Sequence, residues 1–176
     1  LTVSHLTEFE GDCLFLSFMH HGIGSNSGCV YNFREGLANI MYVFRDYKGF
    51  FPSSPDQTLK DIFAMLNETR YVIDPSSVSK QEKEIYIYSY EVMCQDLCNL
   101  KSWTKLPTEL ILMIIARMYK LKITVLDTNI KSRGTTINVF KEESNLPLLE
   151  DFYLGYIGRN HYVSLRKVTE SEIKKG

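Results

Sequence analysis

Near its N-terminus the chain reads Glu10-Gly11-Asp12-Cys13-Leu14-Phe15, and near its C-terminus it reads Gly158-Arg159-Asn160-His161-Tyr162. Apolar residues recur at helical spacing after Cys13, which predicts that the cysteine opens a buried helix. A helix N-terminus favours a thiolate, so we expect it to lower the thiol pKa. The second stretch predicts a tight hairpin whose second strand begins at His161. Together the two stretches predict a cysteine hydrolase in which a nearby imidazole serves as the base.

A structural interpretation of the same two residues also exists. A buried cysteine is usually an inert small hydrophobic residue, and a histidine on a strand usually has a structural role. Gly11 favours the catalytic interpretation, because a glycine two residues before the cysteine permits a tight turn. The backbone N–H groups of Gly11, Asp12 and Cys13 are therefore the candidate oxyanion hole.

The composition is that of one globular domain, and we expect a single domain over residues 1–176. With 176 residues the chain is long enough to bury a core, and hydrophobic residues make up 44% of it. The net charge of −1 and the absence of a Lys/Arg stripe argue against a nucleic-acid partner. The longest apolar run, from Leu110 to Ala116, is too short to cross a membrane. No signal peptide and no initiator methionine are present, which suggests a domain excised from a longer chain.

The four cysteines do not suggest a disulfide framework in a chain of this size, so we expect an intracellular, reducing compartment. Cys94 and Cys98 are four residues apart on a predicted helix, which suits a core face or, less commonly, two metal ligands. His20 and His21 lie too close to Cys13 to complete such a site. We therefore expect no metal site.

The hydrophobic period divides the chain into a helical first part and a later part rich in strands. An extended lead-in over residues 1–9 precedes them. Helices are predicted at residues 13–22, 31–48, 58–71, 79–97 and 108–119, with Gly49 as the C-cap of the second. Strands are predicted at 121–127, 135–141, 152–157 and 161–168. This order predicts an α+β fold in which helices pack on a small, mostly antiparallel sheet.

In this order and spacing the motifs resemble those of the ovarian tumour (OTU) family, which are papain-like deubiquitinating cysteine proteases. The resemblance covers about residues 6–168 and includes a nucleophile motif, a middle block and a closing His-Tyr. The matching residues are Gly11, Cys13, Leu14 and Phe15, then Tyr90, Met93, Trp103, Glu109, Leu110, Ile123 and Val125, and finally His161, Tyr162 and Ser164.

The resemblance implies a papain-like OTU fold and hydrolysis of isopeptide or peptide bonds after the C-terminal Gly-Gly of ubiquitin or a ubiquitin-like modifier. It implies Cys13 as the nucleophile and His161 as the base, with ubiquitin as the partner, no cofactor and a monomeric enzyme. The compartment would be the cytoplasm, or the host cytoplasm if the parent protein is viral or bacterial.

Two positions depart from the family pattern. Glu10 stands where the family has Asp, and Val163 stands where many members have the Asp or Asn that orients the histidine. Three interpretations remain: a Cys-His dyad, an orienting acid from the N-terminal side, or an inactive relative that only binds ubiquitin. Glu10 is the first candidate for the acid, with Asp12 and Glu8 behind it, although Asp12 is expected to face solvent. Another papain-like thiol enzyme, such as an acyltransferase, is a further alternative.

Overall fold

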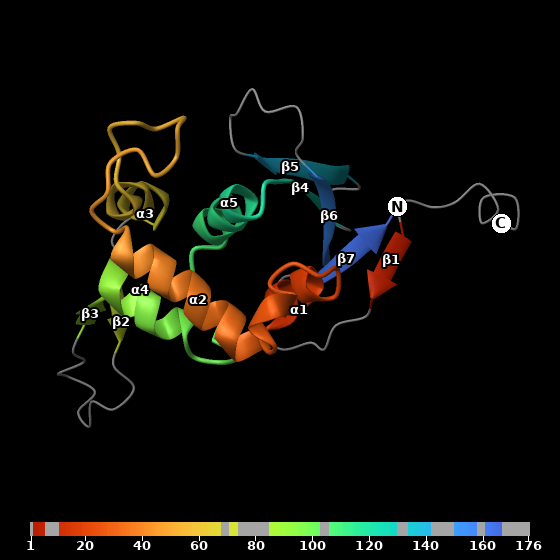
Figure 1. Cartoon of the computed structure of the whole chain (residues 1–176), viewed down its shortest axis with the longest axis horizontal. Helices are drawn as coiled ribbons and strands as arrows, with labels where there is room; N and C mark the ends of the chain where they lie inside the picture. The colour runs from red at the N-terminus through yellow and green to blue at the C-terminus, as the bar shows by residue number, and fades with distance from the viewer. Residues whose placement is uncertain are drawn as a thin grey trace, which may run out of the picture.

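The chain folds as an α+β structure, with most of its helices on one side of a mixed sheet (Figure 1). The computed structural model describes residues 2–5, 11–67, 71–73, 85–102, 106–129, 134–141, 150–157 and 161–166. Its helices are α1 (Cys13–Met19), α2 (Val30–Val43), α3 (Leu59–Asn67), α4 (Tyr90–Leu97) and α5 (Thr108–Met118), with a 3-10 turn at Ser25–Ser27. Its strands are β1 (Thr2–His5), β2 (Tyr71–Ile73), β3 (Ile85–Ile87), β4 (Leu121–Asn129), β5 (Gly134–Lys141), β6 (Glu150–Ile157) and β7 (His161–Arg166).

Five strands form the main sheet, in the order β1-β7-β6-β4-β5, and β2 pairs with β3 in a separate two-stranded sheet. Within the main sheet only β4 and β6 are parallel, and the other three neighbouring pairs are antiparallel. The expected α+β class with a mostly antiparallel sheet is confirmed. β6 and β7 are antiparallel neighbours, with Ile157 opposite His161, as the predicted hairpin requires.

The core lies between the helices and the main sheet. α5 packs on β4 and β5, while α1 packs on β7 and α2 and lies between the helical part and the sheet (Figure 1). The predicted helix over 108–119 is confirmed as α5, which buries an almost continuous apolar surface as its sequence indicates. Leu14 and Phe18 of α1 are fully buried in the same core. The helix that begins at Cys13 is therefore anchored by its own apolar residues.

The predicted helix over residues 79–97 is wrong over residues 85–89, while residues 79–84 lie outside the described part of the chain. Residues 85–87 form β3, paired with β2, and α4 begins only at Tyr90. The Ser89 hydroxyl accepts a hydrogen bond from the Val92 N–H at 3.2 Å, which caps the helix at that point. The β-branched and aromatic sequence Ile85-Tyr86-Ile87 favours a strand. Similarly, Tyr71 belongs to β2 and not to the preceding helix.

The predicted helix over 31–48 ends five residues early, and Gly49 is not its C-cap. α2 ends at Val43, and Phe44 takes the C-cap position. Gly49 adopts a positive φ of 77° within the following loop, where its N–H donates to the Gln57 carbonyl at 3.1 Å. Gly49 thus does adopt the left-handed conformation typical of a C-cap glycine, but it does so in the loop that leads to α3.

Candidate active site

Cys13 lies beside the first residues of β7 because α1 packs on that strand. The N–H of Tyr162, the residue after His161, donates to the Cys13 Sγ at 3.4 Å. One turn along α1, the Ser17 hydroxyl is 2.7 Å from the Cys13 carbonyl and 3.3 Å from the Tyr162 carbonyl. The pairing of β1 with β7 runs only from Ser164 to Arg166, which leaves the backbone of Tyr162 available to α1. Two residues 149 positions apart in sequence are thereby joined.

Burial dominates the electrostatics of the Cys13 thiol. Its residue is 1% exposed, and loss of solvent raises the pKa above the ordinary 9.0. Hydrogen bonding from backbone N–H groups, that of Tyr162 first and those of Leu14 and Cys13 next, lowers the pKa without reversing the net shift. The expected lowering of the thiol pKa by the helix N-terminus is therefore wrong as a net effect, since desolvation outweighs it.

His161 is the first residue of β7 and is 7% exposed. Burial lowers the pKa of its imidazole below the ordinary 6.5, because the low-dielectric surroundings disfavour the charged ring. The opposite shifts of the thiol and the imidazole leave both groups neutral near pH 7. A neutral imidazole is the form that can accept a proton, which is what a general base requires.

The turn before Cys13 is held close to the backbone of residue 101. A Cβ on Gly11 would collide with the Lys101 carbonyl, so only glycine fits there. Lys101 itself has a φ of 64°, a left-handed conformation that is uncommon outside glycine. The tight turn predicted from Gly11 is therefore built from two segments that are far apart in sequence.

Asp12 does not face solvent, contrary to the sequence-based expectation. It is 8% exposed, and its Oδ1 accepts from the Arg34 guanidinium at 2.6 Å and from the Lys101 N–H at 3.0 Å. The negative charge is neutralised inside the protein, on the side of α2. The Asp12 carboxylate is thus part of an ion pair, while the Asp12 backbone N–H remains a candidate donor to the oxyanion hole.

The candidate acids Glu10 and Glu8 lie outside the described residues, as do Asn160, which precedes His161, and Trp103 of the middle block. Val163, two residues after His161, is 1% exposed, and its Cγ2 lies near the Cα of Gly155 on the neighbouring strand. It packs there as an apolar residue and offers the imidazole no acceptor.

Arg34 is the residue of this region that sequence analysis missed. It is completely buried, and its spacing to Leu37, Ala38 and Met41 places it on the buried face of α2. A charged residue at core positions of an amphipathic helix must find partners, because an unpaired buried charge is costly. An arginine at the spacing of the apolar residues of this helix was therefore the sequence feature that could have indicated a buried ion pair.

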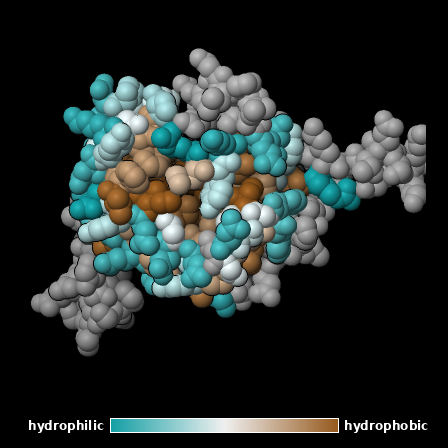
Figure 2. Space-filling view, in the orientation of Figure 1, coloured by the Kyte–Doolittle hydropathy of each residue, from teal (hydrophilic) through white to brown (hydrophobic). Residues whose placement is uncertain are grey.

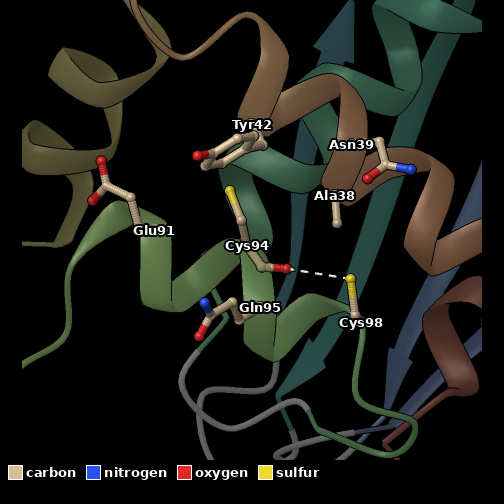
Figure 3. A pocket seen from close by; sticks show the side chains of 7 residues that line it. All are labelled: Ala38, Asn39, Tyr42, Glu91, Cys94, Gln95 and Cys98. Carbon is tan, nitrogen blue, oxygen red and sulfur yellow. Dashed lines mark hydrogen bonds between the residues drawn. The ribbon is translucent and has the colours of Figure 1, made fainter.

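A cavity of about 340 Å³ lies elsewhere, between α2 and α4, and Figure 3 shows its lining. Cys94 and Cys98 line it, and the Cys98 thiol donates to the Cys94 carbonyl at 3.6 Å. Burial raises the pKa of Cys94 to about 12, so its thiol is protonated at neutral pH. Within the described ranges no group of three His, Cys, Asp or Glu side chains is placed to hold a metal ion.

The outer surface adds two observations. Figure 2 shows apolar side chains gathered over the part of the molecule that contains α2, α3 and α5. Val43 of α2 and Met65 of α3 are exposed apolar residues. In the part of the chain that the structure describes, no helix is long and apolar enough to span a membrane.

Comparison with known proteins identifies the fold. No protein-family model matches the sequence, and no curated protein matches it. Among solved structures, the OTU domain of OTUD1 superposes with a TM-score of 0.57 at 14% sequence identity, covering 92% of this chain and 83% of that one. The chain therefore has an OTU-like fold, as the resemblance of its motifs implied.

Proposed function

We propose that the chain is a cysteine-type deubiquitinating peptidase, which hydrolyses isopeptide or peptide bonds after the C-terminal Gly-Gly of ubiquitin or a ubiquitin-like modifier. The observation that carries the proposal is the hydrogen bond from the Tyr162 N–H to the Cys13 Sγ at 3.4 Å. It brings the nucleophile motif to the first residues of the histidine strand, within an OTU-like fold. The enzyme would act as a monomeric single domain in a reducing compartment, where Cys13 remains reduced.

The reaction follows from the protonation states of the two groups. The His161 imidazole takes the Cys13 proton as the sulfur attacks the carbonyl carbon after the Gly-Gly, which forms a tetrahedral oxyanion. Backbone N–H groups of Gly11, Asp12 and Cys13 would stabilise that oxyanion. Collapse breaks the C–N bond, and the imidazolium returns the proton to the departing lysine amine. Water, activated by His161, then hydrolyses the thioester and releases Cys13.

Glu10 is the proposed orienting acid. It lies one residue before the Gly11–Asp12 turn, and Asp12 is already committed to Arg34. A carboxylate beside the imidazole would fix its tautomer and stabilise the imidazolium that forms during attack. Val163 cannot supply either effect.

The test is reaction with ubiquitin that carries a C-terminal electrophile. We expect covalent capture by the wild-type protein and by Cys29→Ser, and none by Cys13→Ala, which should retain ubiquitin binding because little surface is lost. Cys29 is the matched control, since it is a free and exposed thiol. His161→Ala should be as inactive as Cys13→Ala, and the double variant no worse than either.

Binding without capture by the wild-type protein would instead identify a ubiquitin-binding module without catalytic activity. If the protein shows no binding and no capture, ubiquitin is not its partner, and another papain-like thiol enzyme is favoured. Capture that persists in Cys13→Ala would show that another cysteine is the nucleophile.

A further inference from the structure

A buried guanidinium links the nucleophile turn to the helical half of the molecule. Arg34 is 0% exposed, and three of its nitrogens have acceptors within 2.7 Å. Its Nε donates to the Leu97 carbonyl, its Nη2 donates to the Ser102 carbonyl, and its Nη1 donates to the Asp12 carboxylate. The guanidinium carbon also lies 4.8 Å from the centre of the Phe15 ring. Arg34 thus joins α1, α2, the end of α4 and the segment that follows it.

Asp12 carries this network to the nucleophile. It is the residue before Cys13, and its Oδ1 accepts from both Arg34 and the Lys101 N–H. The Lys101 carbonyl meanwhile covers Gly11. Residues 11 and 12 are therefore held by the backbone of Lys101 and by the Arg34 side chain, which also donates to the Ser102 carbonyl. Because Cys13 follows directly, the same contacts define where α1 begins.

The burial of this pair is unusual for a purely stabilising interaction. Removing two charges from water costs free energy that their attraction only partly returns, so apolar replacements of buried pairs are often as stable. Geometric specificity is a recognised reason for keeping such a pair, because the planar guanidinium holds several acceptors in fixed directions. Here the negatively charged acceptor is Asp12, which directly precedes the proposed nucleophile.

We infer that Arg34 is a positioning residue for Cys13: through the Asp12 carboxylate it holds the Gly11–Asp12 turn against residues 101–102 and fixes the thiol and the neighbouring backbone N–H groups. The inference rests on the proposed function for its kinetic consequence. The positioning of the Cys13 thiol itself does not depend on the identity of the substrate. Arg34 does not touch the reacting atoms and acts only through Asp12.

The experiment compares Arg34→Lys and Asp12→Asn with the wild-type protein. Lysine keeps the charge but cannot hold three acceptors in one plane, and asparagine keeps an acceptor but removes the negative charge. Glu91→Gln is the matched control, because Glu91 forms an exposed 2.7 Å ion pair with Lys60 that does not involve α1. Kinetics with a fluorogenic ubiquitin substrate should be measured below the melting temperature of each variant.

We expect the kcat of Arg34→Lys to fall at least tenfold with KM within threefold of wild type, and that of Asp12→Asn to fall less. Glu91→Gln should be unchanged. A folded Arg34→Lys or Asp12→Asn with wild-type kcat would overturn the inference. If Arg34→Lys does not fold, Asp12→Asn decides by the same criterion, since it is nearly isosteric with the native residue.

Alkylation by iodoacetamide separates this inference from the proposed function. Mass spectrometry can follow Cys13 and use the exposed Cys29 as an internal reference. The Asp12 charge raises the Cys13 pKa, so Asp12→Asn should make Cys13 alkylate faster at neutral pH relative to Cys29. Faster alkylation together with a lower kcat would assign the kinetic loss to geometry, because the thiolate fraction has increased.

An unchanged ratio of Cys13 to Cys29 alkylation in both variants would overturn the inference even if the enzyme is active. A changed ratio in Arg34→Lys, which keeps the positive charge, in a protein that shows no reaction with ubiquitin would support the inference while refuting the proposed function.

Discussion

At the scale of single residues, the site combines a thiol whose pKa is raised with an imidazole whose pKa is lowered, both by burial. The resting pair is then neutral, unlike a thiolate–imidazolium ion pair. We predict that the Cys13 thiol titrates above its ordinary pKa of 9.0 in the free protein. Ultraviolet thiolate absorbance is followed against pH for the wild-type protein and for Cys13→Ser. The difference between the two curves measures the titration of the Cys13 thiol directly. A thiolate already present at pH 6 would show a preformed ion pair instead.

The orienting acid gives a second prediction at this scale. If Glu10 supports His161, Glu10→Gln keeps an acceptor but loses the charge that stabilises the imidazolium. We expect the rate to fall more than tenfold, which corresponds to about 1.4 kcal/mol of barrier. Cleavage of a fluorogenic ubiquitin substrate measures it, with Asp151→Asn as a control on an exposed residue of β6. A rate close to wild type would remove Glu10 from the mechanism and leave a Cys-His dyad.

Single residues differ in how far sequence can place them. Cys13 and His161 could be proposed because each sits at the start of an element that its own neighbours predict. The direction of the Asp12 side chain could not, because its partners come from Arg34 on α2 and from the backbone of Lys101. Those contacts depend on how α1, α2 and the end of α4 pack together, which no local pattern encodes.

At the scale of elements, prediction succeeded where an apolar, β-branched or aromatic run is bounded by turn residues. The α5 helix and the strands β4 to β7 are examples. It failed over residues 85–89, where a strand is followed directly by a helix and the boundary depends on one capping serine, Ser89. The pairing of β2 with β3 is a tertiary contact that overrides helix periodicity.

The docking of α1 on β7 gives a prediction for one hydroxyl. Ser17 is completely buried and lies within hydrogen-bond distance of the carbonyls of Cys13 and Tyr162. Ser17→Ala leaves the Tyr162 carbonyl without this donor, so we expect a loss of about 1–2 kcal/mol in the free energy of unfolding. We also expect a lower kcat, because the same contact sets the distance between α1 and the histidine strand.

Ser25→Ala is the control for that change. The Ser25 hydroxyl bonds the Gly22 carbonyl at 2.8 Å on an exposed turn, so its loss should leave both quantities nearly unchanged. Urea denaturation and steady-state kinetics on the two variants make the comparison. Equal stability and equal kcat in Ser17→Ala and Ser25→Ala would show that the α1–β7 contact does not depend on this hydroxyl.

At the scale of the whole molecule, the candidate site and the packing of α5 on the sheet lie in different parts of the fold. The site is formed where α1 meets β7, whereas α5 packs on β4 and β5 within the core. Leu110 of α5 is 0% exposed and belongs to that core. Leu110→Ala would remove buried methyl groups and leave a cavity, which typically costs about 2–5 kcal/mol in the free energy of unfolding.

We therefore predict that Leu110→Ala lowers the free energy of unfolding by that amount while kcat, measured well below the melting temperature, stays within threefold of wild type. Met118→Ala is the matched control, since Met118 lies on the same helix with 43% of its surface exposed, and its loss should cost far less. Urea denaturation gives the stabilities. A Leu110→Ala variant of wild-type stability would show that α5 is not central to the core. A clearly lower kcat in a folded Leu110→Ala variant would mean instead that α5 positions the site. The change in packing around α5 would then be transmitted to Cys13 through the residues between them.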